Sequence, residues 1–258
     1  MKPTLSEIET LAHGAGKILR ECSGQHLQII QKGEIDLVTE ADHRSEAYLI
    51  GKIRQRFPTH RIITEESGVL PGAQEQIWYL DPLDGTLNYA HGLPIYAVSI
   101  AYEENGQVLL GVVYDPERDE CFSAERGRGA WLNGVRLEGP SAQDLDHSLL
   151  VTGFPYDIRT NPANNLDHYA AFALRSYGVR RLGSAAIDLC YVAAGRVDGY
   201  WELRINSWDI AAGALIAQET GAAVTNIAGD SHYLTPPYSI LAASPSLHAQ
   251  MLAILNET

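Results

Sequence analysis

The chain has 258 residues, of which 45% are hydrophobic and 20% are charged, a composition typical of a folded globular protein and not of a disordered one. Its formal net charge of −13, from 19 Lys and Arg against 32 Asp and Glu, makes nucleic acid and an anionic membrane unfavourable partners. The N-terminus has no apolar signal segment and no apolar run approaches membrane-spanning length, so we expect a cytoplasmic protein. Three cysteines without CxxC spacing, Cys22, Cys121 and Cys190, predict buried thiols of a reducing compartment.

Two helices are predicted at the start of the chain. Apolar residues recur at helical spacing over 4–22, and Thr4 and Glu7 form a capping box at its beginning. Thr39 and Asp42 repeat this pattern at the start of a second helix that runs to about Phe57. Asp42 therefore lies in a first helical turn, where a partner of the helix dipole is one interpretation.

The pattern then changes to strands. Short β-rich runs cover 61–66 and 77–81, and the turn pairs Asn105-Gly106 and Asn133-Gly134 predict hairpins of an antiparallel sheet between 95 and 137. The polar segment 138–147 has the composition of a linker. We therefore predict two packed subdomains, an α+β unit at 1–143 and an α/β unit at 144–258.

The second half alternates strands and helices, which is typical of an α/β layer. The predicted strands are 148–152, 199–202, 222–226 and 240–243. The predicted helices are 165–177, 184–194, 209–220 and one that begins at 244–245.

The stretch 78–89, Trp-Tyr-Leu-Asp-Pro-Leu-Asp-Gly-Thr-Leu-Asn-Tyr, begins as an apolar strand and ends in two carboxylates, Asp81 and Asp84. Burying an unpaired carboxylate is costly, so two acids with no basic residue among them require a cation. If a helix begins after Gly85, its free N–H groups would face an anion, and the Thr86 hydroxyl could hold a water or a phosphate oxygen. The alternative is an ordinary Asp-Gly turn capped by Thr86, which leaves both acids unexplained.

Two further acids occupy similar places in the pattern. Glu65 follows a β-rich run, and Asp209 opens a helix of small residues; each alone is more often a helix cap. Together with the first two acids they predict a metal site, and oxygen ligands without His or Cys favour Mg²⁺ over zinc. A carboxylate that bridges two ions about 3.5–4 Å apart is the arrangement used for phosphate ester hydrolysis. Bound cations would also let an acidic protein attract an anionic substrate.

These residues resemble the inositol monophosphatase family of Mg²⁺-dependent, lithium-sensitive phosphatases, and the resemblance covers nearly the whole chain. The segments that carry it are Asp36–Asp42, Thr64–Ser67, Asp81–Tyr89, Gly183–Ala186 and Tyr200–Gly213. The family fold is a layered αβαβα sandwich, commonly a homodimer. With the patterns above it implies an α+β to α/β fold with an antiparallel N-terminal sheet and a smaller mixed C-terminal sheet.

The resemblance also implies metal ligands for two or three Mg²⁺ ions. Glu65, Asp81 and the Leu83 carbonyl match the ligands of a first ion. Asp81, Asp84 and Asp209 match those of a second.

Catalytic and substrate-binding roles are implied in the same way. Asp42 and Thr86, with Glu65, match the group that orients and deprotonates the attacking water. Gly85 and Thr86 match the phosphate-binding backbone, and Ala185 and Glu202 match positions that touch sugar or inositol hydroxyls. The substrate-binding residues implied are Gly85, Thr86, Ala185, Glu202 and Asp209.

The function implied is Mg²⁺-dependent hydrolysis of a small polyol phosphate monoester, with inositol 1-phosphate as the leading candidate. Fructose 1,6-bisphosphate and histidinol phosphate are alternatives on the same fold, and a non-catalytic regulatory protein is an alternative of another class. Arg204 is either a contact to a second phosphate or a subunit, or a solvated charge. Lys32 lies where the family often has a loop lysine, but the spacing differs by one residue, so its role stays open.

Overall fold

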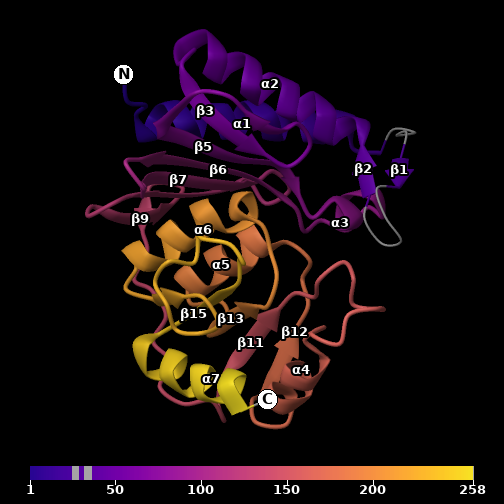
Figure 1. Cartoon of the computed structure of the whole chain (residues 1–258), viewed down its shortest axis with the longest axis vertical. Helices are drawn as coiled ribbons and strands as arrows, with labels where there is room; N and C mark the ends of the chain where they lie inside the picture. Colours follow the sequence, from indigo (N-terminus) through magenta and orange to yellow (C-terminus); the bar gives the residue numbers. More distant parts are fainter. Residues whose placement is uncertain (25–28, 32–36, 258) are drawn as a thin grey trace.

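The chain folds into five stacked layers in the order α–β–α–β–α (Figure 1). The computed structural model describes residues 1–24, 29–31 and 37–257. Helices α1 (Leu5–Cys22) and α2 (Glu40–Arg56) cover the outer face of a large sheet, and α5 (Ala185–Ala193) and α6 (Ser207–Glu219) fill the middle layer. A smaller sheet follows, and α4 (Leu166–Ala173) and α7 (Pro245–Glu257) lie outside it. The expected αβαβα sandwich is confirmed.

The large sheet has eight strands in the order β10-β9-β8-β7-β6-β5-β3-β4. All neighbouring strands are antiparallel except β3 and β5, which run parallel, so the predicted antiparallel sheet contains one parallel pair. The strand bounds are β3 His60–Thr64, β4 Gly68–Leu70, β5 Ala73–Asp84, β6 Ala97–Glu104, β7 Gln107–Asp115, β8 Glu120–Glu125, β9 Gly129–Leu132 and β10 Val135–Arg136.

The smaller sheet has five strands in the order β12-β11-β13-β15-β14 and is mixed, as expected. Its strands are β11 Leu149–Thr152, β12 Gly178–Arg180, β13 Gly199–Glu202, β14 Ala223–Thr225 and β15 Ile240–Ala243. The prediction of one helix over 165–177 is wrong at its C-terminal end, because α4 stops at Ala173 and the chain turns into β12. A two-stranded pair, β1 (Ile29–Gln31) and β2 (Leu37–Thr39), precedes α2, and Lys32 and Asp36 lie outside the described residues.

Both predicted capping boxes form. The Thr4 backbone N–H donates to Glu7 Oε2 at 2.8 Å, and the Thr39 backbone N–H donates to Asp42 Oδ2 at 2.8 Å. The predicted hairpin turns also form, since Asn105 and Asn133 have φ of 53° and 50° and each is followed by a glycine with positive φ.

The hydrophobic core is continuous between the two halves of the chain. Alternate residues of β5 point to opposite faces: Trp78 packs toward α1 and α2, whereas Tyr79 packs in the same cluster as Ile187 and Ile210 of the middle layer. All three cysteines are buried and free, as predicted. The segment 138–147 has no helix or strand, but because one core cluster includes both halves, the division near residue 143 stays a prediction.

A buried polar group anchors the start of the segment after β11. The Asn165 amide donates to Thr152 Oγ1 at 2.9 Å and to the Gly153 carbonyl at 2.7 Å, and its carbonyl accepts from Trp201 Nε1 at 2.7 Å. Asn165 is 2% exposed, so water cannot replace these partners. One side chain therefore ties β11, β13 and the start of α4 together.

Asn165→Ala is expected to lower the free energy of unfolding by about 2–4 kcal/mol, because the buried Trp201 indole N–H loses its partner and the Thr152 hydroxyl and Gly153 carbonyl each lose a hydrogen bond. Equilibrium urea denaturation measures this. Asn105→Ala is the matched control, since Asn105 also has positive φ but lies exposed in a hairpin turn. Equal losses in the two variants would show that backbone strain, and not the buried hydrogen bonds, sets the effect.

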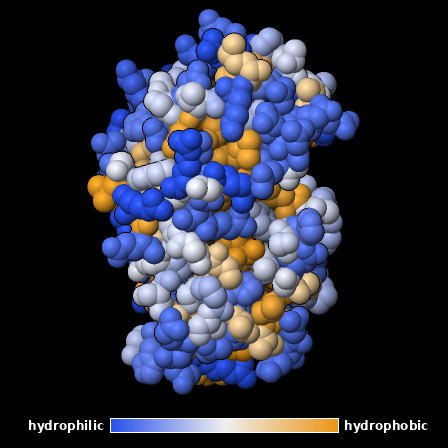
Figure 2. Space-filling model, turned by 90° about the vertical axis from the view of Figure 1, so that its left-hand side faces the viewer, coloured by the Kyte–Doolittle hydropathy of each residue, from blue (hydrophilic) through white to orange (hydrophobic). Residues whose placement is uncertain are grey.

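The surface is mainly polar. On the face shown in Figure 2, hydrophilic residues predominate and hydrophobic ones form separate patches among them. Within the described residues, no helix combines the length and the apolar character needed to cross a membrane.

Candidate active site

A β-bulge sets the two acids of the central motif side by side. Three residues apart on a regular strand, Asp81 and Asp84 would point to opposite faces of the sheet. In β5 they pair with Ser99 and Ala97, which are only two residues apart on β6, so one extra residue is accommodated between them. The bulge therefore turns both carboxylates toward the same side.

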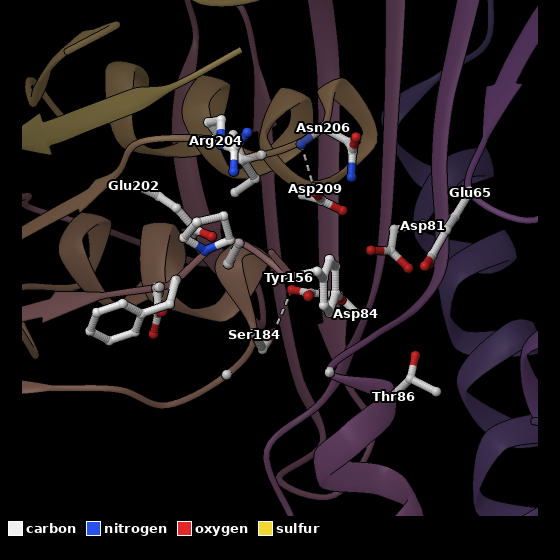
Figure 3. Close-up of a pocket in the computed structure, with 18 of the residues that line it drawn as sticks. Glu65, Asp81, Asp84, Thr86, Tyr156, Ser184, Glu202, Arg204, Asn206 and Asp209 are labelled. Carbon is white, nitrogen blue, oxygen red and sulfur yellow. Dashed lines mark hydrogen bonds between the residues drawn. The ribbon is translucent and has the colours of Figure 1, made fainter. Parts of the chain in front are cut away.

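These acids line a cavity of about 350 Å³ between the large sheet and the segments that follow β11 and β13. In Figure 3 the side chains of Glu65, Asp81, Asp84 and Asp209 surround one shared space. Every predicted site residue except Asp42 lines the cavity: Glu65, Asp81, Leu83, Asp84, Gly85, Thr86, Ala185, Glu202 and Asp209.

Asp42 lies behind the cavity wall and reaches it through Thr86. The Thr86 hydroxyl is 3.0 Å from Asp42 Oδ1 and 3.0 Å from the Leu83 carbonyl, and Asp42 itself is fully buried. The other carboxylate oxygen, Oδ2, accepts from the Thr39 backbone N–H and from its hydroxyl at 2.6 Å. Asp42 is thus the helix-capping residue and also contacts a residue of the cavity, so the cap is confirmed and the catalytic role stays a prediction.

Asp84 and Asp209 are held by the starts of two helices. Asp84 Oδ2 accepts from the Ser184 hydroxyl at 2.6 Å and from the Ala186 backbone N–H at 2.7 Å, at the N-terminus of α5 (Figure 3). Asp209 Oδ2 accepts from the Asn206 backbone N–H at 2.9 Å within the capping box of α6. Residues more than a hundred positions apart therefore meet in one site.

Burial and mutual repulsion make these carboxylates hard to ionise together. Burial, followed by the charges of Glu65, Asp84 and Asp209, raises the pKa of Asp81 well above its ordinary value. Burial raises the pKa of Asp84 to about 6, although hydrogen bonds from Ser184 and α5 oppose the shift. Burial and then the charge of Asp84 raise the pKa of Asp209 to about 7.

The donor set fits a hard divalent cation. Carboxylate and carbonyl oxygens from three segments line the same cavity, and a cation would relieve the repulsion that raises the pKa of these acids. Across the described ranges, no three His, Cys, Asp or Glu side chains are already assembled as a metal-binding cluster. The residues present thus fit Mg²⁺ through their chemistry, and they surround a space without closing on one point.

The far side of the cavity holds Glu202, whose Oε2 accepts from the Tyr200 hydroxyl at 2.6 Å. Burial, followed by the charge of Asp209, raises the pKa of Glu202 to about 8. At the cavity edge Arg204 pairs with Asp157, a partner that neither sequence interpretation of Arg204 included.

The sequence reasoning missed several lining residues. Ser184 belongs to the matching segment 183–186 but received no role, and it holds Asp84. Arg181 lines the cavity and its charge lowers the pKa of Asp84. Asp188 lies in the first turn of α5, and its Oδ1 is buried without a hydrogen-bond partner among the residues that the structure describes. Their sequence signals, a helix cap and charges beside a helix start, do not differ from those of ordinary structural residues.

Gly85 lies where the chain leaves β5 and begins α3 (Thr86–Ala90), with φ of 96°. A Cβ there would lie 2.9 Å from the Ile95 carbonyl oxygen. Gly85→Ala is therefore expected to displace the cavity wall and lower the melting temperature by more than Gly92→Ala, whose Cβ would meet nothing within 4 Å at a similar φ of 70°. Thermal denaturation of both variants measures the difference, and equal shifts would assign the effect to φ alone.

The layered fold and its acidic cavity define a class of protein. A sequence model described as the Inositol monophosphatase family matches residues 1–258, and the chain belongs to this family. It is 42% identical over 260 residues to Nus factor SuhB of Escherichia coli strain K12, covering 100% of this chain and 97% of that protein.

Solved structures agree with this assignment. The inositol monophosphatase from Anabaena (Nostoc) sp. PCC 7120 superposes with a TM-score of 0.88 at 41% identity, covering 98% of this chain and 95% of that one. The inositol monophosphate-bound SaIMPase-II superposes with a TM-score of 0.82 at 25% identity, covering 97% and 92%. The family membership predicted from the sequence is therefore confirmed.

Proposed function

We propose that this protein hydrolyses the phosphate monoester of a small polyol in an Mg²⁺-dependent reaction, with inositol 1-phosphate as the leading substrate. The support is one cavity that gathers four acids from three separate segments, in a chain that belongs to the Inositol monophosphatase family. A relative of the same fold has been solved with inositol monophosphate bound. The proposal includes inhibition of this activity by lithium and assembly of the protein as a homodimer.

Glu65, Asp81, Asp84, Asp209 and the Leu83 carbonyl would hold the Mg²⁺ ions. When bound, Mg²⁺ supplies Lewis-acid chemistry that polarises the phosphoryl group and stabilises charge on the attacking and leaving oxygens. It also offsets the negative charge of the cavity, so that an anionic ester can enter.

Asp42 and Thr86 would move the proton of the attacking water. Because Thr39 occupies Oδ2, Asp42 presents Oδ1 to the Thr86 hydroxyl, so Thr86 Oγ1 would accept a proton from water while its own proton passes to Asp42 Oδ1. Burial raises the pKa of Asp42, which makes it a stronger base than an exposed aspartate. Glu65 lines the same side of the cavity and would orient the water (Figure 3).

The polyol would bind on the far side of the cavity. Glu202 offers a carboxyl group to the hydroxyls of the alcohol, and Ala185, with its small side chain, leaves room for a ring beside the start of α5. Gly85 and the Thr86 backbone would contact the phosphate. Fructose 1,6-bisphosphate and histidinol phosphate remain alternatives for the same cavity.

The test is phosphate release from a panel of small phosphate esters, with and without Mg²⁺. Turnover that requires Mg²⁺ and is fastest with an inositol monophosphate is the expected result. Absence of Mg²⁺-dependent turnover on every ester would overturn the enzymatic function.

A second candidate is a regulatory role without catalysis. The name of the Escherichia coli relative, Nus factor SuhB, favours it. The net charge of −13 makes a basic protein surface a better partner for such a role than nucleic acid. An absence of turnover, combined with retention of a protein partner on the immobilised chain, would select this function over the first.

A further inference from the structure

Glu46 is a buried carboxylate on α2 that holds the turn carrying Glu65. Its Oε1 accepts from the Thr64 hydroxyl at 2.7 Å, from the Glu66 backbone N–H at 3.2 Å and from the Ser67 backbone N–H at 3.0 Å. Its Oε2 accepts from the Ser67 hydroxyl at 2.6 Å. The residue is 4% exposed.

These four donors contact both oxygens of the carboxylate. A carboxylate offers about four lone-pair positions. Here three donors are directed at Oε1 and one at Oε2. Glu46 does not line the acidic cavity. Glu46 therefore acts on the site through the turn and not by lining the cavity itself.

The turn is a short hairpin loop that needs an external support. Thr64 pairs with Gly68, so Glu65, Glu66 and Ser67 form the loop between β3 and β4, and Ser67 is exposed. Loops at a sheet edge are mobile unless other groups fix them. Glu46 fixes the backbone directly after Glu65 to a helix of 17 residues.

The same face of α2 also contacts two other parts of the cavity wall. Ser45 donates to the Pro82 carbonyl at 2.8 Å, inside the bulge between the two acids of β5, and Asp42 contacts Thr86. Asp42, Ser45 and Glu46 are spaced i, i+3, i+4, which places them on one side of the helix. One helix face thus contacts the Glu65 turn, the bulge and the start of α3.

We propose that Glu46 is a positioning residue that fixes Glu65 at the spacing from Asp81 needed to bind Mg²⁺. This inference rests on the proposed function. Metal ligands that a buried neighbour orients lose affinity when that neighbour is removed, commonly by about 10- to 100-fold. The Glu46 carboxylate would orient Glu65 in this way, through its hydrogen bonds to the backbone of the turn.

The test compares Glu46→Gln with Glu46→Ala. Glutamine removes the charge but keeps an oxygen acceptor at Oε1 and a polar group opposite Ser67, whereas alanine removes both. Titration calorimetry with Mg²⁺ is expected to show affinity lowered about 10- to 100-fold in Glu46→Ala, with Glu46→Gln much closer to the unaltered protein. In phosphate release, the Mg²⁺ concentration for half-activation should rise in Glu46→Ala, while kcat at saturating Mg²⁺ recovers.

Asp115→Ala is the matched control. Asp115 is a buried carboxylate that accepts from the backbone N–H groups of Glu117 and Arg118, in a turn that does not line the cavity. A general loss of stability would weaken Mg²⁺ binding equally in both alanine variants and would overturn the proposal. If Glu46→Ala does not fold, Ser67→Ala, at an exposed position, should still weaken Mg²⁺ binding, and unchanged affinity there would overturn it.

The two proposals fail in different ways. An unaltered protein that neither binds Mg²⁺ nor releases phosphate would overturn the proposed function, and the positioning role with it. An unaltered protein that does both, together with an unchanged Mg²⁺ affinity in a folded Glu46→Ala, would overturn the positioning role alone.

Discussion

Asp84→Asn is expected to lower the rate of Mg²⁺-dependent phosphate release by about three orders of magnitude, because a metal ion supplies several kcal/mol of transition-state stabilisation. The amide has one oxygen and no charge, so the predicted second ion loses a ligand. Asp84 Oδ2 also accepts from Ser184 and Ala186, and an amide oxygen in that position can keep both bonds, so the fold should persist. Steady-state phosphate release over a range of Mg²⁺ concentrations measures the loss.

The same substitution should stabilise the protein when Mg²⁺ is absent. Burial and neighbouring acids raise the pKa of Asp81 and Asp209, and removing one charge between them relieves that repulsion. Asp188→Asn is the matched control, because it lines the same cavity but is not a predicted ligand. A near-normal rate in Asp84→Asn, or an equal loss in Asp188→Asn, would remove Asp84 from the metal site.

The stability of the metal-free protein is expected to fall as the pH rises from about 4 to about 8, by a few kcal/mol. Three acids of the cavity set this window: the pKa of Asp84 is raised to about 6, that of Asp209 to about 7 and that of Glu202 to about 8. An acid whose pKa is higher in the folded than in the unfolded state binds more protons when folded. The contribution of such an acid to the free energy of unfolding is therefore complete below its pKa in the unfolded state. It is lost as the pH rises through its pKa in the folded state.

Mg²⁺ should reverse this trend, because it binds the ionised carboxylates and stabilises the folded state by mass action. Urea denaturation at several pH values, with a chelator and then with Mg²⁺, measures how the free energy of unfolding depends on pH for the metal-free and the Mg²⁺-bound protein. The stabilisation by Mg²⁺ should grow with pH across the same window. A metal-free stability that stays flat from acid to neutral pH would show that the buried acids do not titrate as the geometry implies.

The elements that depend on residues close together in the sequence were the most predictable. Thr4 with Glu7 and Thr39 with Asp42 formed their capping boxes, and the Asn-Gly pairs formed their turns, because each involves residues within a few positions of one another. The helix predicted over 165–177 was wrong beyond Ala173, because the chain turns over 174–177 and 178–180 then pairs with β11 as an edge strand. That partner is almost thirty residues away, beyond the reach of local periodicity.

The sequence by itself determined the family, and it predicted the kinds of metal-binding atoms and the segments that carry them. Those conclusions follow from residue chemistry, since a strand that ends in unpaired carboxylates requires a cation. Only the tertiary structure decided which acids face one another: the bulge that turns Asp81 and Asp84 to one side, and the α5 start that holds Asp84. It also decided that Glu46 supports the Glu65 turn, because four donors at fixed distances exist only after the helix packs against the sheet.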